Sequence, residues 1–194
     1  MSAVLYYFSE MGPYVLLAVP VWLLARTFWL AHKEKGPRAG RELLLALFAF
    51  YLIALASQTV LPLPDLRQGL RPLWESARMR IDTQFRINPV PLRTIRAFWH
   101  RGTFEQNLIN LAGNVGIFLP MGLLPPLLWE RWRRLWKTAL LCLSVSCGIE
   151  CLQLFLSRSV DVDDVILNLL GGVLGYLLFA LGRAVAGSSR ARRG

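Results

Sequence analysis

The sequence predicts an all-α protein, a polytopic bundle that crosses a membrane about five times. Of its 194 residues, 55% are hydrophobic and 18% are charged, whereas about a quarter of the residues in a soluble domain are charged. The apolar residues are also gathered into runs that can cross about 30 Å of hydrocarbon as helices. These two observations exclude an ordinary soluble domain, a disordered chain and a disulfide scaffold.

Five stretches are long and apolar enough to span the bilayer. They lie at 12–31, 43–63, 107–128, 138–157 and 164–182. The first contains Pro13, Pro20 and Arg26, but proline is tolerated in membrane helices. No Lys or Arg precedes Arg26, so this start lacks the basic region of a secretory signal peptide and is expected to stay as an anchor. We predict one membrane domain over 1–194.

Basic residues in the short connections predict the orientation. If the N-terminus is outside, 13 of the 22 Lys and Arg residues fall in cytoplasmic segments at 26–41, 131–137 and in a C-terminal tail at 183–194. Short loops decide the positive-inside bias, and long loops carry less weight. The predicted topology therefore has the N-terminus outside and the C-terminus in the cytoplasm.

The one long connection, at 64–106, then lies outside the cell. It holds eight arginines and no lysine: Arg67, Arg71, Arg78, Arg80, Arg86, Arg93, Arg96 and Arg101. Segments such as 91–99 look amphipathic, which is typical of helices that lie in the membrane interface. We call this arginine-rich connection the outer collar. Because Arg binds phosphate and carboxylate groups bidentately, the outer collar is expected to bind anionic lipids, either one specific headgroup or the anionic surface in general. We expect no nucleic acid partner, since the basic surface faces away from the cytoplasm.

Polar side chains recur at helical spacing in the last three spans. The sets are Asn107, Asn110 and Asn114 in the third span, Glu150 and Gln153 in the fourth, and Asp161, Asp164 and Asn168 at the start of the fifth. Within each set the spacing is i, i+3 or i, i+3, i+7, which puts its members on one helix face. In the predicted topology all three sets lie in the outer leaflet. Intramembrane ionisable groups usually face a bundle interior or a wet cavity, so we expect the three faces to meet.

Four pieces of this region form a recognisable pattern. They are 88–95 (NPVPLRTI), 107–122 (NLINLAGNVGIFLPMG), 146–153 (SCGIECLQ) and the run Arg158, Asp161, Asp163, Asp164, Asn168, Gly171, Gly172, Gly175 and Tyr176. The pattern resembles the VanZ-like family of bacterial membrane proteins, named for a factor linked to teicoplanin resistance. Where that family usually reads Asn-x-x-Pro-Phe, this chain has Leu92 after Pro91 and an extra Pro89. The resemblance places a VanZ-like core at about 88–182 and implies a multi-pass protein of the bacterial cytoplasmic membrane; it implies no settled activity.

The leading functional hypothesis is an outward-facing pocket that recognises an anionic lipid-linked component of the cell envelope. The expected binding residues are Asn110, Asn114, Gln153, Arg158 and Asn168, with Arg158 and some arginines of the long connection holding the phosphate. In a catalytic version Glu150 acts as a general base, or Asp161 and Asp164 hold a divalent cation. Apart from that alternative we expect no cofactor and no metal site.

Two other functional classes, a transporter and a non-catalytic accessory protein, are alternatives to this hypothesis. Transport is disfavoured, because the cytoplasmic halves of the spans are almost purely apolar and offer no polar route. A non-catalytic accessory or scaffold protein with a membrane protein partner would need the polar cluster only for structure. In that case Glu150 would bond to Asn114 or Asn168, and Arg158 would pair with an aspartate. An effect on glycopeptide susceptibility is implied only by the resemblance.

Overall fold

The structure, a computed structural model, divides the chain into two compact units, Met1–Pro64 and Asp65–Gly194. The residues that it describes are 14, 16, 18–28, 32, 39–60, 71–101, 104–156 and 158–191, with backbone alone at 98–101, 104–110 and 189–191. A single membrane domain over the whole chain stays a prediction.

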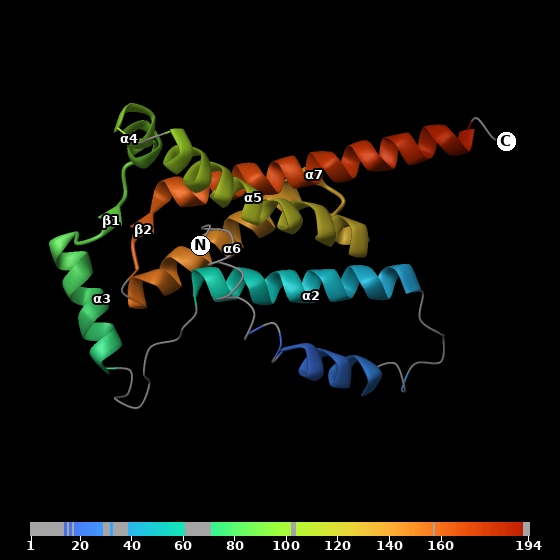
Figure 1. The fold of residues 1–194 in the computed structure, drawn as a ribbon, viewed down its shortest axis with the longest axis horizontal. Coiled ribbons are helices and arrows are strands. Elements are labelled where there is room, and N and C mark those ends of the chain that lie inside the picture. Colours follow the sequence, from blue (N-terminus) through green and yellow to red (C-terminus); the bar gives the residue numbers. More distant parts are fainter. Residues whose placement is uncertain are drawn as a thin grey trace. The chain divides into compact units, whose positions relative to one another are not determined.

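The first unit contains two apolar helices, Ala18–Phe28 and α2, Ala39–Thr59 (Figure 1). Arg26 is the unfavourable charge in the first predicted span, and its guanidinium forms a bidentate ion pair with Glu42, at 2.5 and 2.6 Å. Each of these two side chains is about one fifth exposed (18% and 20%). Pairing removes most of the cost of holding either charge among apolar residues.

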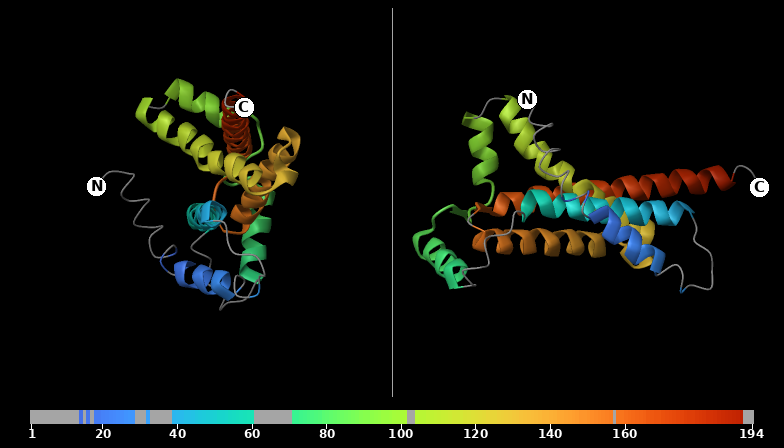
Figure 2. Two further views of the ribbon diagram at one scale, coloured as in Figure 1. Left: turned by 90° about the vertical axis from the view of Figure 1, so that its right-hand side faces the viewer. Right: turned by 60° about the horizontal axis from the view of Figure 1, so that its bottom comes forward.

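The second unit holds three long helices and the short elements that connect them. In chain order these are α3 Arg71–Thr83, β1 Ile87–Asn88, α4 Arg93–Arg101, α5 Phe104–Leu128, a 3-10 turn Glu130–Trp132, α6 Leu135–Phe155, β2 Val160–Asp161 and α7 Val162–Ala191. Helices α5 and α7 run in the same direction and α6 runs against both, so α5 and α7 begin where α6 ends (Figures 1 and 2). The short elements α3, β1, α4 and β2 gather at that shared end.

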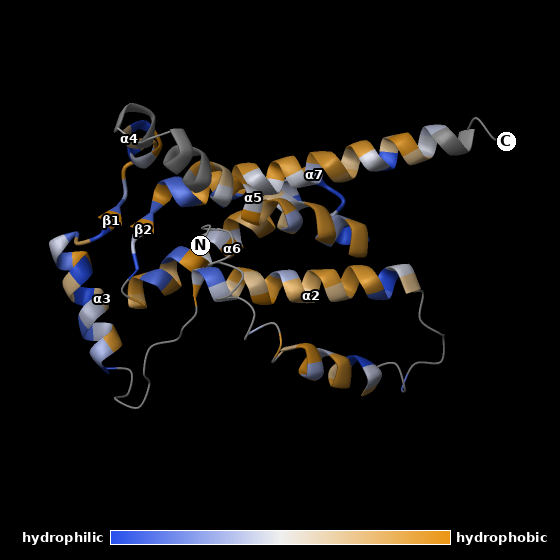
Figure 3. Ribbon diagram, viewed as in Figure 1, coloured by the Kyte–Doolittle hydropathy of each residue, from blue (hydrophilic) through white to orange (hydrophobic). Residues whose placement is uncertain are grey.

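Among the described residues, four helical stretches are long and apolar enough to cross a membrane. They are Ala39–Thr59, Leu111–Leu128, Leu135–Phe155 and Val162–Ser188. Figure 3 shows apolar residues along these helices, in contrast to the hydrophilic α3 and the first turn of α7. The predicted all-helical, multi-pass architecture is therefore confirmed. The first predicted span, 12–31, contributes the shorter apolar helix Ala18–Phe28, and much of the remainder lies outside the described residues.

Two predicted boundaries differ from the structure. Helix α7 has 30 residues, or about 45 Å at 1.5 Å per residue, so it continues well beyond 182 and makes most of the predicted tail at 183–194 helical. The long connection at 64–106 is not a simple loop, because it contains α3, β1 and α4.

Glycines allow α5 and α7 to approach closely. A Cβ added at Gly171 would overlap the backbone carbonyl of Val115, and one added at Gly175 would overlap that of Leu119. Small residues permit such backbone contact between membrane helices, where packing rather than hydrophobicity drives association. This contact brings the first turns of α7 beside α5 and fixes the polar cluster described next.

Candidate functional site

A two-residue parallel strand pair joins the long connection to the start of α7. Ile87 pairs with Val160 and Asn88 with Asp161, and the backbone N–H of Val160 donates to the carbonyl oxygen of Arg86 at 3.0 Å. After α6 the chain therefore runs alongside β1, in the same direction, before α7 begins. This pairing carries residues 84–95 to the shared end of the three long helices.

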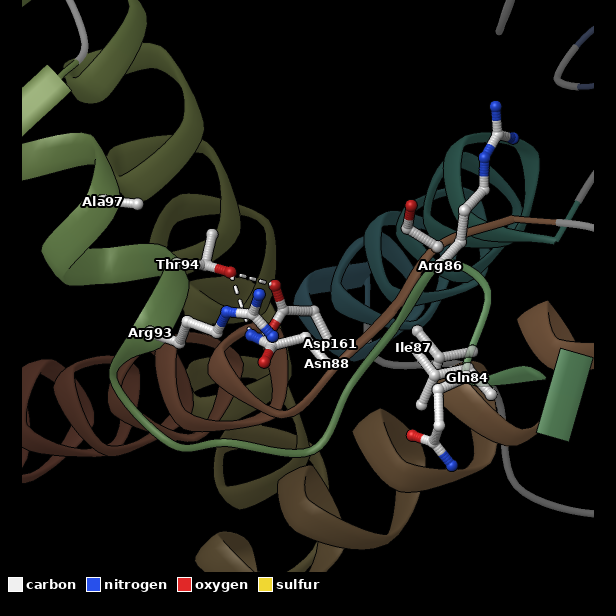
Figure 4. Close-up of a pocket in the computed structure, with 10 residues that line it drawn as sticks. Gln84, Arg86, Ile87, Asn88, Arg93, Thr94, Ala97 and Asp161 are labelled. Atoms are coloured by element: carbon white, nitrogen blue, oxygen red, sulfur yellow. Dashed lines mark hydrogen bonds between the residues drawn. The ribbon is translucent and has the colours of Figure 1, made fainter. Parts of the chain in front are cut away.

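Asp161 is held at this junction by both carboxylate oxygens. Its Oδ1 accepts hydrogen bonds from Asn88 Nδ2 and from the backbone N–H of Asp163, each at 2.9 Å. Its Oδ2 accepts one from Thr94 Oγ1, and Asn88 Nδ2 also donates to Thr94 Oγ1 at 3.1 Å. Figure 4 shows Asn88, Thr94 and Asp161 as one connected group.

Asp163 binds the N-terminal turn of α4. Its carboxylate is fully buried and accepts the backbone N–H groups of Leu92 at 2.5 Å, Thr94 at 2.7 Å and Ile95 at 3.0 Å. These are donors that a helix start leaves unpaired, and a negative charge there is favourable to the helix dipole. Leu92 has a φ of 64°, a left-handed conformation that is rare for a leucine, and the three bonds offset its strain.

The polar faces of the three long helices meet beside this junction. Asn114 Nδ2 of α5 donates to Asp164 Oδ1 of α7 at 2.5 Å, and Asn168 Nδ2 donates to Ser146 Oγ of α6 at 2.9 Å. Glu150 is buried and accepts the backbone N–H of Asp161 at 2.9 Å. This differs from the bonds of Glu150 to Asn114 or Asn168 expected above for a purely structural cluster.

Arg80, one of the eight arginines of the predicted outer collar, is buried instead of exposed. Arg80 of α3 is 2% exposed, and its guanidinium donates to the carbonyl oxygens of Gln153 at 3.2 Å, Leu154 at 2.5 Å and Arg158. The carbonyls of Gln153 and Leu154 belong to the last turn of α6, where a cation is favourable, and that of Arg158 lies just beyond it. Burial, and then the charge of Arg86, lower the pKa of Arg80 from its ordinary value. The collar assignment is therefore wrong for Arg80, which stabilises the end of α6.

Next to Asp161 lies an open cleft of about 640 Å³. Its lining residues are Gln84, Arg86, Ile87, Asn88, Arg93, Thr94, Ala97, Ser159, Val160 and Asp161. Arg86 and Arg93 are exposed, and neither forms an ion pair with any side chain in the described part of the chain. The cleft combines two guanidinium groups with an amide, a hydroxyl and a carboxylate, a set able to bind phosphate and hydroxyl groups.

Only one of the predicted site residues, Asp161, lines this cleft. Glu150, Asp164, Asn114 and Asn168 lie in the bundle behind it. Gln153 and Arg158 offer their backbone carbonyls to Arg80, and the side chain of Asn110 lies outside the described residues. Arg86 and Arg93 were predicted only as two of the eight arginines of the long connection. The cleft residues missed are Asn88 and Thr94, and the motif at 88–95, which contains both, was the available signal.

No group of three or more His, Cys, Asp and Glu side chains within the described ranges is placed to hold a metal ion. The alternative of a divalent cation at Asp161 and Asp164 gains no support, because oxygens of both carboxylates already accept hydrogen bonds. The absence of a cofactor stays a prediction.

Comparison with known proteins agrees with the pattern in the sequence. A family model described as VanZ/LLP1 matches residues 48–183, more than two thirds of the chain, and the matched range includes β1, α4, α5, α6 and most of α7. Comparison with curated proteins and with solved structures gives no match. The family match and the four membrane-length helices establish that this chain is a multi-pass membrane protein of the VanZ/LLP1 family.

Proposed function

We propose that the protein binds an anionic, lipid-linked component of the bacterial cell envelope, with the phosphate-bearing headgroup in the cleft beside Asp161. The observation that carries this proposal is that Arg86 and Arg93 line the same cleft as Asn88, Thr94 and Asp161. Guanidinium groups bind phosphate through paired hydrogen bonds. The volume of about 640 Å³ falls within the range of about 300–1,000 Å³ typical of small-molecule sites.

The position of the cleft supports a membrane lipid as the ligand. Its strands β1 and β2 lie where α6 ends and α7 begins, so it is at the edge of the hydrocarbon layer that these helices cross. A headgroup can enter there while its chains remain in the bilayer. The proposed orientation has this end outside the cytoplasmic membrane, because the short basic connection with Arg131, Arg133 and Arg134 is at the opposite end of α5 and α6.

Binding without chemistry is the version that the geometry supports best. Glu150 accepts a hydrogen bond from the backbone and does not line the cleft, so it is not placed as a base for a ligand there. Asp161 does line the cleft, but its oxygens hold Asn88, Thr94 and the N–H of Asp163. Its remaining acceptor capacity suits a ligand hydroxyl group.

The test compares three arginine variants in the full-length protein. Arg86→Gln and Arg93→Gln remove the cleft cations, while Arg96→Gln removes an exposed cation of α4 that does not line the cleft. The probe is short-chain phosphatidic acid, added to protein in nanodiscs of phosphatidylcholine. We expect each cleft variant to weaken the Kd about tenfold, because each loses a charge-assisted bond, and Arg96→Gln to bind as wild type. Equal losses in all three variants would indicate general attraction to the charged surface and overturn the proposal.

An effect on glycopeptide susceptibility is proposed as a consequence of this binding. A protein that holds a lipid-linked envelope precursor by its headgroup would compete with an antibiotic that binds the same molecule. Expression of the wild-type protein should then change teicoplanin susceptibility, and Arg86→Gln with Arg93→Gln should abolish the change at equal abundance. An unchanged effect in that double variant would separate susceptibility from the cleft.

The second candidate is an accessory protein in which the polar cluster is structural and a membrane protein is the partner. It is favoured by one observation: Glu150, Asp161, Asp163 and Asp164 all accept hydrogen bonds from within the chain. For this candidate the cleft variants should leave lipid binding unchanged, and the protein should be recovered with a partner after mild crosslinking.

A further inference from the structure

A second cavity, of about 240 Å³, lies between α3 and the end of α6. Its lining residues are Trp74, Ala77, Arg78, Ile81, Leu154 and Phe155, of which only Arg78 is charged. The rings of Trp74 and Phe155 are stacked, with centroids 6.2 Å apart and planes at 24°. Trp74 is 64% exposed and Ile81 is 50% exposed. The cavity is therefore an apolar groove with an aromatic wall, and we call it the α3–α6 groove.

The spacing of residues on α3 builds this groove. Ala77 and Arg80 are buried, and the bonds of Arg80 to the carbonyls of Gln153 and Leu154 hold α3 against the end of α6. Trp74, Arg78 and Ile81 follow one another at i, i+4 and i+7, which places them on one face beside the buried face. Helix α3 lies crosswise to α6 and α7 at their shared end (Figures 1 and 2).

We infer that the α3–α6 groove binds an acyl chain of an anionic phospholipid, with the lipid phosphate at Arg78. Phe155 is the last residue of a helix that is long enough to cross the membrane, so the groove lies at the boundary of the hydrocarbon layer. Tryptophan is enriched at this depth. A lipid chain can cover an apolar surface of this kind, because the chain needs no hydrogen bonds from its binding site.

The positive charge of Arg78 at the edge of the groove favours a lipid with an anionic headgroup. Arg78 lines the groove and its side chain is 77% exposed, and its ion pair with Asp82 is long, at 3.9 Å. Exposed pairs of this kind contribute little, so the guanidinium can exchange Asp82 for a phosphate, which it binds bidentately. The groove shares no lining residue with the cleft, and this inference goes beyond the proposed function and does not depend on it.

Two tryptophan substitutions on α3 test the groove. Ile81→Trp places a large side chain in it, while Met79→Trp adds the same side chain at a position that is 53% exposed and does not line it. Both are made in the Arg86→Gln, Arg93→Gln background, so that binding in the cleft does not enter the comparison. Lipid binding to the detergent-solubilised full-length protein is measured by native mass spectrometry, with dioleoyl phosphatidylglycerol, dioleoyl phosphatidylcholine and glycerol 3-phosphate as probes.

We expect Ile81→Trp to weaken phosphatidylglycerol binding about tenfold relative to Met79→Trp, because the chain loses its apolar contacts. Glycerol 3-phosphate, which has no chain, should not bind at this site. Arg78→Gln should weaken phosphatidylglycerol binding several-fold and phosphatidylcholine binding less, because the choline cation next to the phosphate of phosphatidylcholine opposes the attraction to a guanidinium.

Three results would overturn the inference. One is equal binding by the two tryptophan variants, and another is binding of glycerol 3-phosphate that is sensitive to Ile81→Trp. The third comes from a photo-crosslinking residue at position 74: an adduct with a protein rather than with phospholipid would assign the groove to a protein partner. Unchanged phosphatidic acid binding on loss of Arg86 and Arg93 would overturn only the cleft proposal, since the groove comparison is made without those residues.

Discussion

Asp163 Oδ2 accepts the backbone N–H of Thr94 at 2.7 Å, across 69 residues of sequence, and so joins the first turn of α7 to the first turn of α4. With its bonds to Leu92 and Ile95, this single carboxylate determines where α4 begins. Because Arg93 and Thr94 line the cleft, the shape of the cleft depends on a residue outside it.

Replacement of Asp163 should therefore destabilise the fold. Asp163→Ala leaves three backbone donors without their acceptor, and we expect a loss of about 2 kcal/mol in the free energy of unfolding. Asp82→Asn, which changes a carboxylate with a side chain that is 67% exposed, is the control and should behave as wild type. Thermal unfolding of both variants in one detergent measures the difference. Similar midpoints for both would show that Asp163 does not hold α4.

Loss of Arg80 should have a larger effect than loss of any exposed arginine. Arg80→Gln removes the buried charge that binds the last carbonyls of α6, and we expect a cost of about 3 kcal/mol. Arg78→Gln on the same helix, where the side chain is 77% exposed, is the control. The measurement is again thermal unfolding, with limited proteolysis at α3 as a local readout. If Arg80→Gln were as stable and as protease-resistant as Arg78→Gln, the anchoring role would be excluded.

Two substitutions of Glu150 separate its hydrogen bond from its charge. Glu150→Gln keeps an oxygen that can accept the N–H of Asp161, so its stability should be close to that of wild type. Glu150→Ala loses that acceptor, and we expect about 2 kcal/mol of destabilisation. Thermal unfolding near neutral pH compares the two. A large loss in Glu150→Gln would mean that the negative charge itself stabilises the cluster.

Close approach of α5 and α7 predicts opposite effects of alanine at two glycines. Gly175→Ala would push a Cβ into the carbonyl of Leu119, whereas the Cβ of Gly116→Ala meets no atom within 4 Å. We expect Gly175→Ala to cost about 2 kcal/mol and Gly116→Ala to be neutral or slightly stabilising, because alanine favours a helix. Unfolding midpoints test both. Equal tolerance would contradict the packing of these helices.

The proposed orientation predicts which connections react with a membrane-impermeant maleimide. Ser159→Cys, at the exposed residue that precedes β2, should be labelled in intact cells. Glu130→Cys, at a side chain that is 85% exposed at the opposite end of the long helices, should be labelled only after the cells are permeabilised. Both are made in a background without Cys142, Cys147 and Cys151. The reverse pattern would place the cleft on the cytoplasmic side.

Local composition was sufficient to predict the membrane helices. A run of about 20 apolar residues has few alternatives to a spanning helix, because every backbone polar group must be paired within it. Helical spacing also put Asp164 and Asn168 on one face, and these two side chains bond to α5 and α6. The prediction was wrong for Asp161, which lies in β2 before α7 begins and bonds to Asn88 and Thr94. The end of α7 was less predictable, because nothing in composition stops a helix at the edge of the hydrocarbon, and α7 continues to Ala191.

The sequence by itself determined the family pattern, the helices and which polar residues share a helix face, since these follow from composition and from the period of the helix. Only the tertiary structure decided which groups the charged side chains contact. The eight arginines of the long connection look alike in sequence, yet the packing of α3 on α6 buries Arg80 and leaves Arg86 and Arg93 exposed at the cleft. Likewise, Asp163 binds backbone N–H groups rather than solvent, because the pairing of β1 with β2 brings together segments about 70 residues apart, a distance over which helical spacing carries no information.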